Sequence, residues 1–101
     1  MNLFHYRGGL KSLAGLVALQ ALKIHVDAVI FSGSAESEES IPAVNTWLET
    51  NGLPTIDALP KYDAKTEVVE PIAEIGWGKE ECLVAVRLSG LPIPQDTKIF
   101  N

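Results

Sequence analysis

The sequence predicts a small single α/β domain over residues 1–101, with a mostly parallel four-stranded sheet and two main helices. Two segments with apolar residues three and four positions apart predict the helices, and short β-branched runs that alternate with them predict strands. The expected order is β-α-β-α-β, followed by an uncertain element and a final strand. With 47% hydrophobic and 21% charged residues, the composition is that of a globular chain with one core.

The first strand and the first helix are predicted from residues 1–24. Residues 1–7 are rich in large apolar side chains and end at a glycine pair, which predicts a strand that closes on a tight turn. From residue 10 to residue 24 the apolar spacing is that of a helix, but Leu16 and Leu19 fall on its otherwise polar side. Such a helix is either sandwiched inside the fold or buried against a second copy of the chain, with Leu16 and Leu19 as contact residues.

A central strand and a second helix follow. Residues 25–31 are almost continuously apolar and partly β-branched, which is typical of a strand covered on both faces. Ser40 is a suitable N-cap for the next helix, and Pro42 suits its first turn. Asn51 and Gly52 predict its end, because both residue types tolerate the left-handed backbone of a helix stop.

The second half of the chain is less regular. Prolines at both ends of residues 53–60 predict a short edge strand, and residues 61–65 are expected to form a polar connector. Residues 66–77 fit either a helix or an irregular strand, because a proline and β-branched residues interrupt a helical spacing. Residues 82–88 predict a final, mostly buried strand, and residues 89–101 are expected to form an irregular tail.

Charge is unevenly distributed along the chain. The net charge is −5, yet residues 1–34 carry three cationic side chains against one acidic, whereas residues 35–74 carry nine acidic against two cationic. A dedicated nucleic-acid binder needs clustered lysines and arginines, so nucleic acid is not an expected partner. A protein partner with a basic surface would complement the acidic middle of the chain.

Two further features of the sequence bear on where in the cell the protein is expected. The apolar run of the first helix is broken by Gln20 and Lys23, well before the roughly 20 apolar residues that a membrane span needs. The single cysteine, Cys82, has no partner for an internal disulfide. We therefore expect a cytoplasmic protein that does not associate with a membrane.

The turns after the first two predicted strands carry residues suited to an anion. The carboxyl ends of parallel strands share one edge of a sheet, where ligands of α/β folds collect. Glycines admit an anion close to backbone N–H groups, and a helix N-terminus and cationic side chains add positive charge. The alternative is that both segments are plain turns, because their spacing matches neither of the glycine-rich phosphate-binding motifs. The candidate anion-binding residues are Arg7, Gly8, Gly9, Lys11, Ser12, Ser32 and Ser34.

No catalytic set is complete, and neither a metal nor a cofactor is expected. His5 and His25 lack metal-ligand spacing, and Cys82 opens an apolar segment, which indicates a buried, inert thiol. The acidic residues between 36 and 39 are interpreted as complementing a helix start rather than as cation ligands. Trp77 lies between two glycines and is either an exposed partner-contact residue or a side chain folded over the core edge.

The same two turns resemble those of haloacid-dehalogenase-like phosphatases. That family has an Asp-x-Asp-Gly motif after its first strand and Ser/Thr-Gly after its second. Here residues 5–8, His-Tyr-Arg-Gly, stand in the first place, and residues 32–33, Ser-Gly, in the second. Both aspartates are missing, and with them the phosphoryl-accepting nucleophile, the general acid and the magnesium carboxylate. The resemblance implies a degenerate, catalytically inactive relative.

Two functional hypotheses follow. The first is a small, acidic, non-catalytic binding or regulatory module that forms a homo-oligomer through the helix of residues 10–24 or the strand of residues 82–88. The second is a domain or an enzyme that binds a small phosphorylated or carboxylated ligand at the candidate anion-binding residues.

Overall fold

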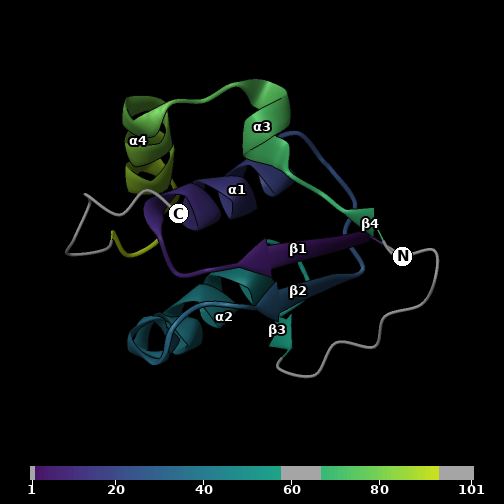
Figure 1. The fold of residues 1–101 in the computed structure, drawn as a ribbon, viewed down its shortest axis with the longest axis vertical. Helices are drawn as coiled ribbons and strands as arrows, with labels where there is room; N and C mark the ends of the chain where they lie inside the picture. The colour runs from purple at the N-terminus through teal and green to yellow at the C-terminus, as the bar shows by residue number, and fades with distance from the viewer. Residues whose placement is uncertain (1, 58–66, 94–101) are drawn as a thin grey trace.

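The structure is a computed structural model that describes residues 2–57 and 67–93 (Figure 1). It confirms an α/β fold with a parallel sheet. The elements in chain order are β1 (Asn2–Tyr6), α1 (Leu10–Ala21), β2 (Ala28–Phe31), the 3₁₀ helix η1 (Ala35–Ser40), α2 (Ile41–Thr50), β3 (Ile56–Asp57), β4 (Glu67–Val68), α3 (Pro71–Ile75) and α4 (Lys79–Ser89).

The strands of the sheet lie in the order β3-β2-β1-β4, and every pairing is parallel. The centre of the sheet is the pair β1 and β2, whose register runs from Leu3 opposite Ala28 to Tyr6 opposite Phe31. At the edges, β3 and β4 contribute two residues each. The prediction of four full strands is therefore not confirmed, and the predicted strand over residues 53–60 is reduced to Ile56–Asp57 within its described part.

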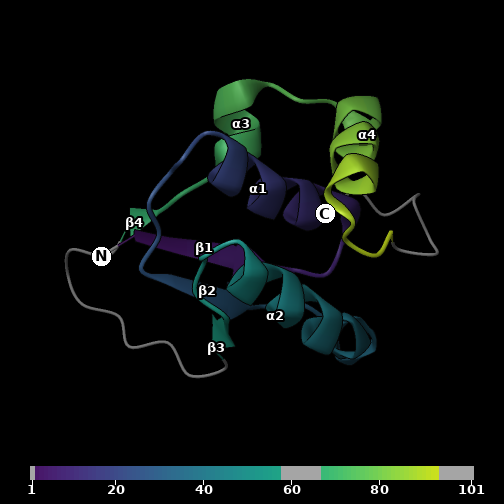
Figure 2. The same ribbon diagram turned by 180° about the vertical axis from the view of Figure 1, so that it is seen from behind.

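The first helix lies between two layers. In both views α1 lies between the strands on one side and α3 and α4 on the other (Figures 1 and 2). Of the two alternatives for this helix, burial inside the chain's own fold is the one observed, since Leu16 and Leu19 are each 0% exposed. No helix in the described ranges is long and apolar enough to cross a bilayer.

The prediction of a strand over residues 82–88 is wrong, because this segment is part of α4. Cys82 and Val86, one helical turn apart, are buried in the main core, while Val84 and Leu88 on another side are 52% and 83% exposed. β-Branched residues favour strands only weakly, and burial of one helical stripe against α1 outweighs that preference. Gly90, with φ +85°, ends the helix in the left-handed conformation.

The described part of the segment predicted as a helix or an irregular strand, residues 67–77, contains both structures. Glu67–Val68 forms β4, and Pro71 then begins the short helix α3. A proline suits this first helical position, because the N–H that it lacks would have no partner within the helix. Within the predicted tail, Leu91 is 4% exposed and belongs to the core. The predicted connector over residues 61–65 lies outside the described residues.

The second helix is confirmed, but it begins differently from the prediction. Ser40 does not cap α2 with its side chain. Its hydroxyl donates to the Ser37 carbonyl oxygen at 2.7 Å and accepts from the Tyr6 hydroxyl, with the oxygens 2.6 Å apart. Burial raises the pKa of Tyr6, with the Ser40 hydrogen bond opposing it, so the phenol stays a neutral donor. This bond ties the end of β1 to the start of α2.

Asp27 holds the beginnings of β1 and β2 together. One carboxylate oxygen, Oδ2, accepts the Asn2 backbone N–H at 2.7 Å, and Oδ1 lies 3.0 Å from Nε2 of His25. The Asn2 hydrogen bond and then the His25 hydrogen bond lower the pKa of Asp27 below its ordinary value of 3.8. A lowered pKa means that the ionised carboxylate stabilises the folded chain more than its protonated form does.

We expect the Asp27→Asn variant to have a lower Tm than the wild type at neutral pH, because the uncharged amide makes weaker hydrogen bonds to Asn2 and His25. The stabilisation is fully present above pH 3.8 and is lost as the pH falls through the lowered pKa of Asp27, so the two Tm values should converge in acid. Thermal denaturation followed by circular dichroism between pH 2 and pH 7, in ~0.1 M salt, measures this difference. A Tm difference that persists unchanged at the acidic limit would contradict the assignment.

Candidate functional site

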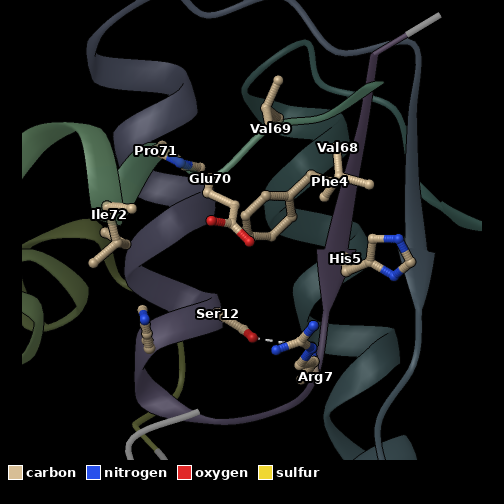
Figure 3. A pocket seen from close by; sticks show the side chains of 11 residues that line it. Phe4, His5, Arg7, Ser12, Val68, Val69, Glu70, Pro71 and Ile72 are labelled. Carbon is tan, nitrogen blue, oxygen red and sulfur yellow. Dashed lines mark hydrogen bonds between the residues drawn. The ribbon is translucent and has the colours of Figure 1, made fainter. Parts of the chain in front are cut away.

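A cavity lies beside β1, at the place where the order of strands reverses. From β1 the chain continues to β2 and β3 on one side, whereas β4 pairs with the other side of β1. The segments that leave the ends of β1 and β4 therefore diverge, and such a reversal is where open α/β sheets form ligand crevices. A cavity of about 110 Å³ occupies this position (Figure 3).

Three segments form the walls of this cavity. The end of β1 and the first turn of α1 contribute Arg7, Lys11 and Ser12, and the segment from β4 into α3 contributes Glu70. Phe4, which is 6% exposed, supplies an aromatic wall. The cavity therefore combines an apolar lining with a few charged and hydroxyl groups, the usual composition of a small-molecule site.

A buried hydroxyl fixes the turn that carries the cationic side chains. The Arg7 backbone N–H donates to Oγ of Ser12 at 3.0 Å, and Ser12 is only 6% exposed. Gly9 enters α1 with an extended backbone and no side chain to cap the helix. The Arg7–Ser12 hydrogen bond thus holds the last residue before the glycine pair against the first turn of α1 and limits where Arg7 can lie.

Arg7 and Glu70, which carry opposite charges, both line this cavity without forming an ion pair with each other. The Arg7 guanidinium and the Glu70 carboxylate are therefore more than 4.0 Å apart. Both side chains are exposed at the cavity. The carboxylate of Glu70 points into the cavity, and Arg7 lies beside Ser12 at its other end (Figure 3).

The structure divides the seven candidate anion-binding residues into three groups. Arg7, Lys11 and Ser12 line the cavity, whereas neither Ser32 nor Ser34 does. The remaining two, Gly8 and Gly9, shape the turn between β1 and α1: Gly8 has φ +89°, which favours glycine, and Gly9 precedes the helix.

The turn after β2 packs against the turn after β1 instead of lining the cavity. A Cβ on Gly8 would lie 2.3 Å from Cβ of Ser37, whose hydroxyl is 3.3 Å from that of Ser34. A Cβ on Gly33 would lie 2.5 Å from the Arg7 carbonyl oxygen. The glycines in these turns therefore allow close backbone packing, which is the structural alternative for the second turn.

The three predicted partner-contact residues are all placed at least partly inside the chain. Leu16 and Leu19 lie in its own core and offer no surface to another molecule. Trp77 is half-buried and packs against the core cluster. Since the first two side chains are covered by the chain's own elements, a contact surface on α1 would need other residues.

Sequence reasoning missed Glu70 as a site residue. The residue was one of nine acidic side chains in the middle of the chain, within a segment whose conformation the pattern left open. Only the pairing of β4 with β1 brings it to the cavity. His5 also borders the cavity, but its ring lies on the other side of β1 from Phe4, as expected for successive residues of a strand (Figure 3).

Other reactive groups lie outside this site. Cys82 is a free, buried thiol whose pKa is raised, first by burial and then by the nearby Glu81 carboxylate, so it stays protonated. In the part of the chain that the structure describes, no group of three His, Cys, Asp or Glu side chains could hold a metal ion.

No family model, no curated protein and no solved structure matches this chain. The resemblance to haloacid-dehalogenase-like phosphatases thus depends on the two turns alone. At the places of the two aspartates the structure has His5, with its ring away from the cavity, and Arg7, a cation at the cavity wall.

Replacing Gly33 with alanine should destabilise the protein by about 1–3 kcal/mol, the usual cost of overpacking. The added Cβ would meet the Arg7 carbonyl oxygen at 2.5 Å and Cε1 of Phe31 at 2.8 Å, and backbone cannot move aside as a side chain can. Urea denaturation measures the free energy of unfolding. Ser32→Ala, at an exposed neighbouring side chain, is the control and should change it by less than about 0.5 kcal/mol. Equal stability of the two variants would contradict close packing of the turns.

Proposed function

We propose that this protein is a non-catalytic binding module that takes a small anionic ligand, a phosphate or a carboxylate, in the cavity beside β1. One observation carries the proposal: Arg7, Lys11 and the buried Ser12 converge on a single cavity at the reversal of strand order. Arg7 directly follows β1, and the first turn of α1 supplies the other two side chains. Their separation in sequence is short, so the local fold alone sets their spacing.

The chemistry of these side chains suits an anion. A guanidinium can donate two parallel hydrogen bonds to a phosphate or carboxylate, and an ammonium adds a compact point charge. At about 110 Å³ the cavity is smaller than the roughly 300–1,000 Å³ typical of drug-sized ligands. It therefore suits a small molecule or the charged end of a larger one.

The cavity supports binding better than catalysis. A nucleophilic enzyme needs a nucleophile within hydrogen-bond reach of a base. Among the described lining residues the one hydroxyl is that of Ser12, whose oxygen accepts the Arg7 N–H, and the His5 ring is turned to the other side of the strand. The missing aspartates of the phosphatase-like motif support the same proposal of a degenerate relative without catalytic activity.

Self-association stays part of this proposal, on a different surface from α1. The exposed apolar side chains Val84 and Leu88 lie one helical turn apart on α4, the segment that was expected to be the final strand. Light scattering at high protein concentration tests it: a strictly monomeric mass contradicts self-association, and a dimeric mass that Leu88→Glu converts to a monomeric one supports it.

Arg7→Ala should weaken the binding of inorganic phosphate by at least about tenfold, because a hydrogen bond to a charged group contributes roughly 1.5–3 kcal/mol. Lys11→Ala should weaken it as well, and Arg7→Lys should retain part of the affinity because it keeps the charge and loses the paired donors. Titration of the full chain with phosphate, followed by the chemical shifts of backbone amides, measures the Kd.

Arg87→Ala is the matched control, because it removes the same charge from the exposed surface of α4. If neither phosphate nor acetate binds saturably to the wild type, or if Arg7→Ala and Arg87→Ala have the same Kd, the proposed function is wrong.

A further inference from the structure

We infer that the ligand of this cavity is zwitterionic, a small molecule with a phosphate or carboxylate at one end and an ammonium group at the other. The inference rests on the proposed function and adds the chemical class of the ligand. Its basis is that Glu70 and Arg7 share one cavity and do not form an ion pair with each other.

The two charged groups reach the cavity from different elements. Arg7 follows β1 and is tied to α1 through Ser12, whereas Glu70 belongs to the segment between β4 and α3. The Glu70 carboxylate points into the cavity, toward the side where Arg7 and Ser12 lie (Figure 3), but forms no ion pair with Arg7. The cavity therefore has a positive end, with Arg7 and Lys11, and a negative side.

The side chain of Glu70 has no structural task that would explain this position. Its backbone carbonyl accepts the Glu74 N–H at 3.2 Å, but its carboxylate does not cap α3, and it is in no ion pair within the described ranges. A carboxylate that points into a site for a simple anion lowers the affinity for that anion by repulsion between like charges. A ligand with its own cation turns the same carboxylate into an attractive partner.

The rest of the lining suits a short hydrocarbon link between the two ligand charges. Phe4, Val69 and Pro71 give the same cavity an apolar surface beside the charged groups, and Phe4 and Pro71 are buried. The cavity volume of about 110 Å³ is several times the roughly 10–15 Å³ that one water molecule requires, so a few non-hydrogen atoms fit. α-Amino acids and aminoalkyl phosphates are the two chemical sources of such a ligand.

The test compares inorganic phosphate, O-phosphoethanolamine and glycine as ligands of the full chain, by calorimetry or chemical-shift titration. We expect the wild type to bind one of the two zwitterions roughly three- to tenfold more tightly than the matching simple anion, phosphate or acetate, which is the size of one added charge contact near a surface. Glu70→Gln should abolish this preference and bind phosphate more tightly than the wild type does. Arg7→Ala should weaken the binding of both the zwitterions and the simple anions.

Glu74→Gln is the matched control, because Glu74 is an exposed carboxylate four residues further along that does not line the cavity. It should keep the wild-type preference. If simple anions bind and Glu70→Gln leaves their affinity and the preference for the zwitterion unchanged, the inference is overturned while the proposed function stands. If no anion binds to either the wild type or Glu70→Gln, the proposed function itself fails. Preference for glycine or for O-phosphoethanolamine supports the inference and identifies the anionic end.

Discussion

The near-complete burial of α1 is the constraint on which the rest of this structure depends. A helix with leucines on opposite sides must be covered on both, and here the sheet covers one side while α3 and α4 cover the other. Full burial of a leucine stabilises a fold by about 1.5–3 kcal/mol relative to its exposure. Burial of Leu16 and Leu19 therefore strongly favours the packing of α3 and α4 against α1. The helical form of residues 79–89 follows, since a helix can present Cys82 and Val86 together to α1.

The cavity is a consequence of the same arrangement. The α3–α4 layer must begin from a strand that reaches the side of α1, and β4 does this by pairing with the edge of β1 that β2 leaves open. The connection into α3 then lies opposite the first turn of α1, and Glu70 faces the residues that follow β1. A charged site thus forms beside a core whose own residues are almost entirely apolar.

How far the sequence predicts this structure differs between the two halves of the chain. The pattern of residues 1–50 predicts the order of β1, α1, β2 and α2, because each element has a clear period and its own start and stop residues. The pattern of residues 82–88 misleads, because a short apolar, β-branched run fits a buried strand as well as a buried helix. Of the candidate site, Arg7, Lys11 and Ser12 were predictable because they lie within six residues of one another at a strand end.

By itself the sequence determined the parallel α/β class, an α1 that had to be buried, and a cationic turn after β1. Those properties depend on local period and on residue type, which a chain carries with it before it folds. Only the tertiary structure decided that α1 is covered by α4 rather than by a second copy, that Ser32 and Ser34 lie away from the cavity, and that Glu70 faces it. The reason is that strand order is set by which edge of β1 is free and which core face needs cover, and neither is visible in local patterns.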